Sequence, residues 1–297
     1  MDDVVATVRC DTAEDLLARL SPQNRFWQPD PSAWIFRGHS CSDGWKLLAS
    51  AHRDGVEEVY RRWGLVPTEQ PNADDLWSSR RHAEWNLTES FRRALDEAGL
   101  NIPSEPADAF GFGEIGIAGE IPLEKLPLLA LAQHLGIPTS LLDWTRISTK
   151  AAYFAAADRK YGEDGDLAVW AVRAIHVDGP MTHGHMNVSL VTAPLSSNPN
   201  LHAQSGVFTR ARGTTIVTVD EYVQWRYEQR LTDVPPGTPS FLLPAPLPWM
   251  HKLTLPRSQA RRLLRLLSYT GINGSSMFPG HIGVVKRLEE EAYWKRR

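Results

Sequence analysis

The stretch from residue 126 to residue 156 constrains the fold most, because it combines long apolar runs with a tight turn. Its first part, Leu128–His134, is rich in Leu and Ala, which favours a buried helix, and Pro127 suits the first helical position. The sequence Gly136-Ile137-Pro138 then predicts a turn, since Gly is favoured just after a helix and Pro cannot continue one.

A short strand and a second helix are predicted after this turn. Ser140–Thr145 is mostly apolar and bounded by polar residues, which is typical of a buried strand. Ser148–Ala156 predicts a buried helix with Ser148 or Thr149 as its N-cap. Buried polar side chains need partners, so several of them beside one turn indicate a site: Gln133, His134, Asp143, Trp144 and Thr145.

The sequence QHLGIPTSLLDWT at residues 133–145, followed by AAYFA at 151–155, resembles the central signature of the FRG domain family. The Phe-Arg-Gly tripeptide that names this family is present as Phe36-Arg37-Gly38. Further matches follow in the family's order between residues 34 and 285: Trp45, Leu47, Arg53, Glu84, Phe91, the Gln204–Phe208 segment and Phe278-Pro279. One departure is Ser140, where the family often has Arg. The resemblance implies a family and not a reaction, because the family's name describes a motif.

Composition bounds the class of protein. With 297 residues, 42% of them hydrophobic and 11 of them Trp, the chain can bury a substantial core. Its net charge of −3 gives no general reason to expect a nucleic-acid or membrane partner. Two cysteines, Cys10 and Cys41, make no disulfide framework and are expected to be reduced. The acidic N-terminus and the lack of a long apolar run lead us to expect a cytoplasmic protein that spans no membrane.

The rest of the chain mixes both kinds of secondary structure. Strands are predicted at residues 4–9, 33–38, 166–172, 201–209, 214–219 and 251–255, and helices at 13–20 (capped by Thr12), 75–98, 220–230 (capped by Asp220), 257–267 and near the C-terminus. In that last helix, Ile282, Val285, Leu288 and Ala292 share one face. The fold class is therefore α+β with a mixed or antiparallel sheet, in a single domain over residues 1–297. Residues 54–80 and 99–120 fit the family pattern least, and the Gly/Pro-rich part at 101–120 is expected to be a loop.

Arg37 is the first candidate for a functional residue. An Arg at the end of an apolar strand, beside a Gly that allows close approach, suits a phosphate or carboxylate, which the guanidinium binds with two parallel hydrogen bonds. The alternative is a structural Arg that pairs with an internal carboxylate such as Asp143.

Five other candidates follow, and for most of them a structural role is the alternative. Asp143 more readily serves as a cap or an Arg partner than as a catalyst, whereas Trp144 and Thr145 suit the wall of a pocket. Gln204 can hydrogen-bond a ribose but cannot act as a general base. His134 suits an acid or base, although a histidine after a buried helix is more often structural.

Taken in order, the Phe36, Asp143 and Gln204 motifs are also similar, more loosely, to the layout of the mono-ADP-ribosyltransferase superfamily. This similarity implies a sheet of that superfamily's type, NAD as the cofactor between the Phe-Arg-Gly and Asp-Trp-Thr strands, and a macromolecular acceptor, as in a bacterial toxin or phage-defence effector. The catalytic residues would be Arg37, Thr145 and Gln204, and the cofactor would be contacted by Arg37, Gly38, His134, Trp144, Thr145, Tyr153 and Phe208.

The chain departs from that superfamily on its third strand, which lacks both catalytic glutamates. Gln204 in their place would keep a hydrogen bond to the ribose but lose the stabilising charge. Transferase activity is then altered or absent, unless a carboxylate arrives from elsewhere, for example Glu114 or Glu120.

The rival hypothesis is a non-catalytic module that binds a nucleotide or a protein. The same polar residues would fix the core, and residues 54–80 and 99–120 would contact partners. An open pocket around Arg37, Thr145 and Gln204 favours ligand chemistry, whereas full burial of Arg37 against Asp143 favours the rival. Expected partners are a nucleotide, a protein or nucleic-acid acceptor, and an antitoxin or regulatory protein. No metal is expected, because the histidines at 176, 183 and 185 lack carboxylate or Cys partners at ligand spacing.

Overall fold

The computed structural model describes residues 4–65, 73–103, 108–110, 122–158, 162, 164–177, 186–196, 198–213, 217–232 and 248–295. The described strands form an eight-stranded sheet in the order β1-β8-β5-β2-β4-β7-β6-β3. Only β1 and β8 pair in parallel, so the sheet is mixed, as predicted. The strands are β1 Val5–Arg9, β2 Trp34–His39, β3 Asp108–Phe110, β4 Leu141–Thr145, β5 Asp166–Arg173, β6 Met186–Thr192, β7 Gly206–Gly213 and β8 Met250–Pro256.

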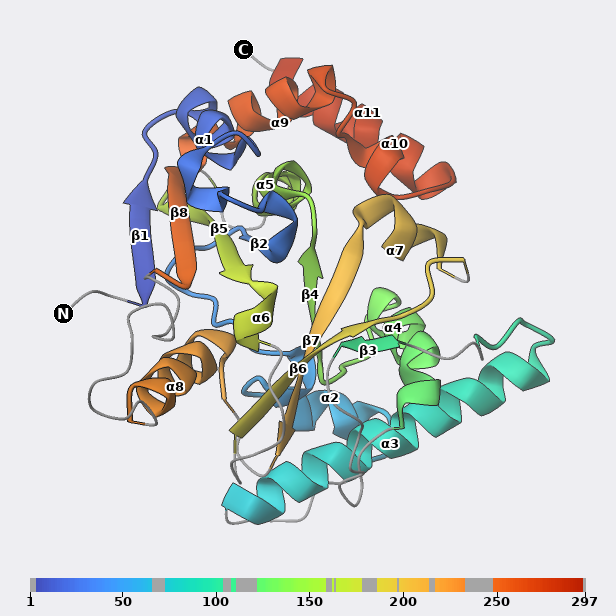
Figure 1. Ribbon diagram of the computed structural model, residues 1–297. Helices are drawn as coiled ribbons and strands as arrows, with labels where there is room; N and C mark the ends of the chain where they lie inside the picture. Colours follow the sequence, from blue (N-terminus) through green and yellow to red (C-terminus); the bar gives the residue numbers. More distant parts are fainter. Residues whose placement is uncertain are drawn as a thin grey trace.

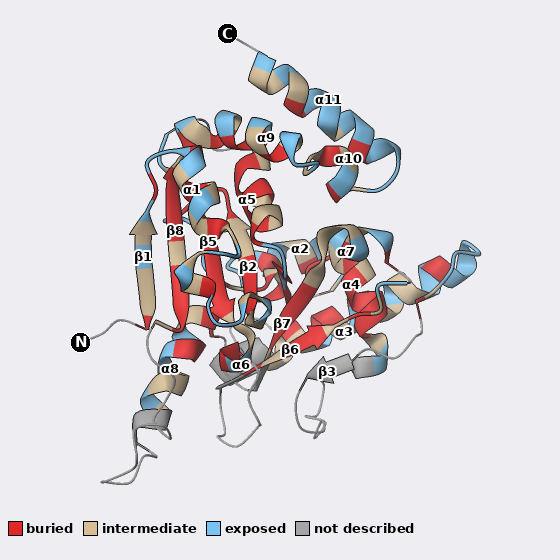
Figure 2. Ribbon diagram, turned by 45° about the horizontal axis from the view of Figure 1, so that its top comes forward, coloured by how far each residue is buried: buried red, intermediate tan, exposed pale blue. Residues whose placement is uncertain are grey.

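Helices cover both faces of this sheet (Figure 1). One core cluster lies under α1, α5 and α9 and contains Trp27, Trp34 and Leu263, and another lies on the side of α8 and contains Trp144 and Trp249. Figure 2 shows β5 and β8 buried along most of their length, while β1 at the edge is less buried. The helices are α1 Ala13–Leu20, α2 Val56–Arg62, α3 Ala73–Glu97, α4 Leu126–His134, α5 Ser148–Ala157, α6 Ala174–Val177, α7 Pro199–Gln204, α8 Val219–Thr232, α9 Ala260–Tyr269, α10 Gly274–Met277 and α11 His281–Lys295.

The sheet is split between β2 and β4. Between β2 and β4, Phe36 and Thr145 form the single residue pair. By contrast, β2 pairs with β5 at six positions, and β4 pairs with β7 at five. Arg37 and Gly38, which follow the shared pair on β2, and Trp144, which precedes it on β4, therefore face a region without a backbone ladder. An interruption inside a sheet leaves room that side chains or a ligand can fill.

Helix α5 packs closely on β2, and Gly38 makes this contact possible. A Cβ atom on Gly38 would lie 2.1 Å from the carbonyl oxygen of Ala151 and 2.5 Å from the amide nitrogen of Ala155. The backbone of α5 thus requires the glycine of the tripeptide, which is a reason that the sequence did not suggest.

Several predicted elements are confirmed. Helix α1 begins after Thr12, whose hydroxyl accepts from the amide of Asp15, and Gly136 ends α4 with φ of +90°. The strand β4 and the helix over 75–98 also form as expected.

Other predictions are wrong. Residues 201–209 do not form one strand: α7 ends at Gln204, Ser205 adopts φ of +50°, and β7 begins at Gly206. Helix α5 is preceded by Ile147 and not capped by Ser148 or Thr149. The hydroxyl of Ser148 instead donates to the carbonyl of Leu20.

Further corrections concern the cap of α8, two predicted segments and the apolar face of α11. Helix α8 is capped by Thr218 and Glu221, which exchange hydrogen bonds, rather than by Asp220. Residues 101–120 contain the short strand β3. Of the strand predicted at 214–219, residues 214–216 lie outside the described residues, 217 and 218 are not in a strand, and Val219 begins α8. On α11, Ile282 and Leu288 are 70% and 60% exposed, so this apolar face does not contribute to the core.

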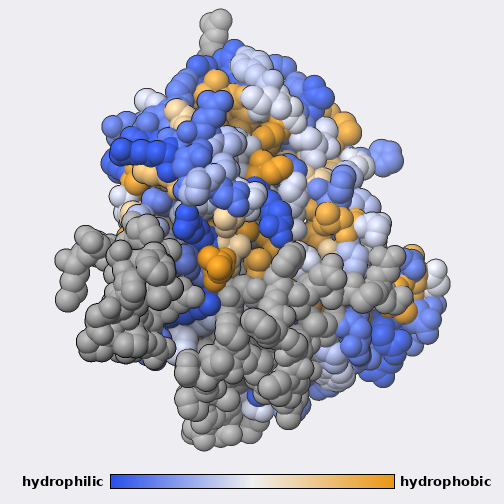
Figure 3. All heavy atoms as spheres, viewed as in Figure 1, coloured by the Kyte–Doolittle hydropathy of each residue, from blue (hydrophilic) through white to orange (hydrophobic). Residues whose placement is uncertain are grey.

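The described surface seen from the side of Figure 1 carries several separate hydrophobic patches among hydrophilic side chains (Figure 3). Within the described residues, no helix is both long enough and apolar enough to cross a membrane.

Candidate functional site in the split of the sheet

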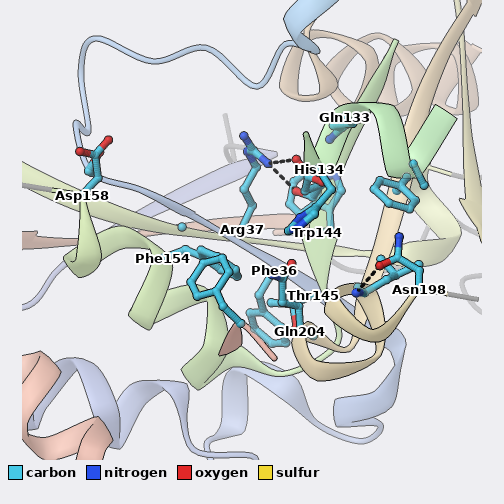
Figure 4. A pocket seen from close by; sticks show the side chains of 18 of the residues that line it. Phe36, Arg37, Gln133, His134, Trp144, Thr145, Phe154, Asp158, Asn198 and Gln204 are labelled. Carbon is cyan, nitrogen blue, oxygen red and sulfur yellow. Dashed lines mark hydrogen bonds and ion pairs between the residues drawn. The ribbon is translucent and has the colours of Figure 1, made fainter. Parts of the chain in front are cut away.

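A cavity of about 380 Å³ lies at the split, and we call it the split cavity (Figure 4). Strands β2, β4 and β7 and helices α4, α5 and α7 all contribute to its wall. The lining residues are Phe36, Arg37, Gly38, Ser40, Trp45, Ala130, Gln133, His134, Asp143, Trp144, Thr145, Phe154, Asp158, Asn198, Leu201, Gln204, Gly206, Phe208 and Phe278. Apart from Tyr153, every residue that the sequence predicted for the site lines this cavity, including Arg37 and Gln204.

Arg37 spans the split. Its Nη1 donates to the carbonyl oxygen of Asp143 at 2.6 Å and lies 3.7 Å from the Asp143 carboxylate (dashed lines in Figure 4). Burial lowers the pKa of Arg37 to about 10, which still leaves the guanidinium charged at neutral pH. The structure supports both predicted roles of Arg37 in part. Its contact with Asp143 fits a structural arginine, and its place in the lining of the cavity fits an arginine that binds an anion.

His39 orients Arg37 from behind. Its Nε2 accepts from Nε of Arg37 at 3.0 Å, so this imidazole must be neutral, with its proton on Nδ1. Burial, together with the positive charges of Arg37, Arg53 and Lys252, lowers the pKa of His39 to about 2. Sequence reasoning missed this residue, although its position two residues after Arg37 on the same strand face is a usable signal.

The cavity is positively charged near Arg37. The positive charge of Arg53 helps to lower the pKa of Arg37, because the two guanidinium groups repel each other electrostatically. Arg53 is fixed by donation from its Nε to the carbonyl of Leu48 at 3.0 Å. Arg37 lines the cavity and Arg53 adds positive charge from outside its lining, which favours an anionic ligand.

Thr145 joins β4 to the end of α7. Its hydroxyl donates to the carbonyl of Gln204 at 2.7 Å and accepts from the amide of Ile147 at 3.1 Å. The neighbouring Trp144 is 3% exposed, and its indole donates to the hydroxyl of Thr209 at 2.9 Å. Thr145 and Trp144 therefore shape the wall, and their polar groups are already engaged within the protein.

Gln204 stands at the C-terminus of α7 and not on a strand. Its side-chain amide donates to the carbonyl of Met277 at 3.2 Å, which leaves the amide oxygen as the acceptor of this side chain. Lys150 holds the same turn, because its ammonium donates to the carbonyl of Ala203 at 2.5 Å and to the hydroxyl of Ser205 at 2.8 Å. These contacts fix Gln204 at the cavity.

Tyr153 does not line the cavity, contrary to the prediction. It is 1% exposed, and its hydroxyl donates to the carboxylate of Glu290 on α11 at 2.5 Å. The next residue, Phe154, lines the cavity instead (Figure 4). One residue along a helix turns the side chain by about 100°, so the pattern Ala-Ala-Tyr-Phe-Ala alone does not identify which ring enters the site.

His134 and Phe208 lie on the α4 side of the cavity. His134 is exposed at the end of α4, and partial burial lowers its pKa while the nearby Asp143 opposes this effect. Phe208 is buried with the side chains of α4, such as Leu129 and Ala130. His134 therefore remains available to a ligand, whereas Phe208 forms part of the wall.

Two carboxylates, Asp143 and Asp158, line the cavity. Neither was predicted from the sequence as a replacement for the negative charge of the absent catalytic glutamates. Asp143 is 60% exposed, and Asp158 follows the end of α5 and accepts from the hydroxyl of Ser40 at 3.5 Å. In Figure 4, Asp158 lies on the opposite side of Arg37 from Asn198. Glu114 and Glu120, the predicted substitutes, lie outside the described residues.

Among the described residues, no group of three His, Cys, Asp or Glu side chains is arranged to hold a metal ion. His183 and His185 lie outside that part of the chain, and His176 stacks on Trp249 with 3.8 Å between ring centroids.

Comparison with protein families matches residues 32–164 to the FRG domain. The match contains β2, α4, β4 and α5, which together build most of the split cavity. This chain therefore contains an FRG domain over residues 32–164, as its sequence motifs predicted. Gln204 and Phe278 lie beyond the matched residues. No curated protein and no solved structure matches the chain.

Proposed function

We propose that the split cavity binds NAD and that the protein transfers ADP-ribose from NAD to a macromolecular acceptor. The observation that carries the proposal is the largely buried, charged guanidinium of Arg37 at a break in the sheet, in one cavity with Gln204 and two carboxylates. The order of these motifs along the chain supports the same reading, through their similarity to the ADP-ribosyltransferase layout.

The diphosphate of NAD would lie against Arg37, with Arg53 adding positive charge. Guanidinium groups bind phosphate oxygens through pairs of hydrogen bonds. Phe36, Phe154 and Phe278 offer apolar walls for the nicotinamide ring. The free amide oxygen of Gln204 would accept a hydrogen bond from a ribose hydroxyl.

In the transfer, the bond between ribose C1′ and the nicotinamide nitrogen breaks, and its electron pair leaves with neutral nicotinamide. An acceptor oxygen or nitrogen then bonds to C1′ and loses its proton. The ribose passes through an oxocarbenium-like state, which a nearby negative charge stabilises. Asp143 is the best placed group for that charge and for the proton, because its carboxylate is exposed and lies beside Arg37.

The alternative function is a binding module without catalysis. It is favoured by the internal hydrogen bonds of Arg37 and Thr145, which occupy donors that a ligand would otherwise take. The same cavity would then hold a nucleotide without turning it over. An effector role directed at a macromolecule, with a regulatory partner such as an antitoxin, belongs to the catalytic proposal only.

Calorimetric titration of NAD and of ADP-ribose separates these readings. We expect both to bind wild type, and Arg37→Gln to weaken binding at least about tenfold, since a charged hydrogen bond to phosphate is worth more than 1.4 kcal/mol. Arg61→Gln, at an exposed position on α2, is the matched control and should bind as wild type does. Release of nicotinamide together with transfer of labelled ADP-ribose to a macromolecule of a cell extract would identify the transferase, and binding without release would identify the module. A folded wild type that binds neither compound would overturn both.

A further inference from the structure

A second cavity, of about 410 Å³, lies at the β1 edge of the sheet, away from the split. We call it the β1 cavity. Its lining includes Val8 of β1, Arg173 of β5 and His251 of β8, together with Arg25 and Phe26 from the segment that follows α1. Figure 1 shows β1 and β8 side by side at this edge. The volume falls within the range of small-molecule sites.

Sheet register explains how these side chains meet. Ala6 lies opposite His251, and His251 lies opposite Ala171 of β5. Arg173 is two residues beyond Ala171, so it projects from the same face as His251. Phe26 then covers His251, with 4.8 Å between the ring centroids and 29° between the ring planes. The two stacked rings form a flat, apolar wall beside a guanidinium group.

Neither arginine of the β1 cavity forms a direct ion pair with a described carboxylate, although the charge of Arg173 helps to lower the pKa of Asp30. In the described part of the chain, no carboxylate lies within 4.0 Å of the guanidinium of Arg25 or of Arg173. Nε of Arg173 is also buried without a hydrogen-bond partner there, although the guanidinium lies over the ring of Trp34 at 5.4 Å. Two like charges at one cavity repel each other, and the partly buried guanidinium of Arg173 needs acceptors, so a bound anion would relieve both costs.

We propose that the β1 cavity binds a small organic anion. Its phosphate or carboxylate group would be held by Arg25 and Arg173, and its apolar body would rest on Phe26, His251 and Val8. The planar guanidinium matches either anion with paired hydrogen bonds, and the stacked rings select a ligand that carries a flat apolar group. This site is independent of the NAD proposal, because it shares no lining residue with the split cavity.

Titration followed by NMR or calorimetry tests the site with defined probes: phenyl phosphate, benzoate, and benzyl alcohol as a neutral analogue. We expect one or both anions to bind wild type, and benzyl alcohol to bind at least about tenfold more weakly, as expected when the charged hydrogen bonds are lost. Arg173→Gln and Arg25→Gln should each weaken anion binding at least about tenfold on the same grounds. Arg61→Gln and Arg37→Gln should leave it unchanged, which separates the β1 cavity from the split cavity.

Each result has one meaning. Binding of phenyl phosphate alone assigns the site to phosphorylated ligands, and binding of benzoate alone assigns it to carboxylates. The exposed position of Arg25 keeps the test valid if Arg173→Gln does not fold. The proposal is overturned if folded wild type binds neither anion, or if Arg37→Gln abolishes binding while Arg25→Gln does not.

Discussion

The guanidinium of Arg37 donates to the backbone carbonyl of Asp143 across 2.6 Å, at the point where the ladder between β2 and β4 has stopped. A side chain thus replaces a missing backbone hydrogen bond between two strands. Because His39 holds the other side of the same guanidinium, Arg37 is fixed before any ligand arrives. A fixed, desolvated cation loses little conformational freedom on binding, which favours recognition of an anion at this split.

Replacing Gly38 by Ala tests the close contact between β2 and α5. The new Cβ would lie 2.1 Å from the carbonyl oxygen of Ala151, a backbone atom that cannot move without shifting the helix. We expect Gly38→Ala to lower the free energy of unfolding by about 3 kcal/mol or more, as overpacking of a tight core does. Urea unfolding followed by circular dichroism measures this loss.

Gly136→Ala is the matched control for Gly38. It has open space around its Cβ position but a φ of +90°, so its cost comes from backbone conformation alone. That cost should be about 1–2 kcal/mol. If Gly38→Ala costs no more than Gly136→Ala, the tripeptide glycine is not explained by helix packing.

The sequence predicted best those features that depend on neighbouring residues. The cap at Thr12, the end of α4 at Gly136 and the strand β4 all follow from local chemistry. The boundary between α7 and β7 was missed, because it depends on Ser205 in a left-handed conformation, which Lys150 stabilises from another helix. Local propensity cannot report such a contact.

The candidate site was predicted in part for the same reason. Motif order brought Arg37 and Gln204 together, and the structure places both in one cavity. The split between β2 and β4 was not foreseen, since strand register is a long-range property. Asp158 was overlooked because its place in the wall depends on where α5 ends relative to β2. Tyr153 was chosen over Phe154 because the side of α5 that faces the cavity was unknown.

Tyr153 and Phe154 provide a paired test of the cavity wall. Tyr153→Phe removes a buried hydrogen bond to Glu290 and should lower the free energy of unfolding by about 1–3 kcal/mol, without changing NAD affinity. Phe154→Ala should weaken NAD binding, because this ring lines the split cavity. Calorimetric titration and urea unfolding of both variants check the pair. The opposite pattern, with NAD affinity lost in Tyr153→Phe alone, would show that Tyr153 and not Phe154 contacts NAD.

Three buried histidines predict a loss of stability in mild acid. Burial lowers the pKa of His39 to about 2, of His52 to about 3 and of His251 to about 4. An unfolded histidine titrates near 6.5, so below that pH the unfolded chain binds protons that the folded chain does not. Stability is therefore full above pH 6.5 and falls as the pH drops from 6.5 towards 4, by about 1 kcal/mol per histidine between pH 7.5 and 5.5.

Urea unfolding at these two pH values measures the effect, and His251→Phe isolates one contribution. The ring of His251 lies in an aromatic cluster with Phe26 and Trp27, so Phe fits the site. The pH dependence of this variant should be smaller by about 1 kcal/mol. His202→Gln, at an exposed position, should leave it unchanged. Equal pH dependence in wild type and His251→Phe would show that His251 is not held neutral by its surroundings.

Asp143 is expected to supply the negative charge that Gln204 cannot. If the protein transfers ADP-ribose, Asp143→Asn should lower kcat by about 10²–10³-fold, the usual effect of removing one electrostatic contact to a transition state. NAD affinity should change less than about tenfold, because ground-state contacts with phosphate remain. The fold should persist, since the Asp143 side chain is 60% exposed and its carbonyl still accepts from Arg37. Rates of nicotinamide release for Asp143→Asn, with Asp164→Asn as a control at an exposed carboxylate, decide the matter. An unchanged kcat in Asp143→Asn would mean that the stabilising charge comes from another group, and Asp158, on the other wall of the cavity, is the next to replace.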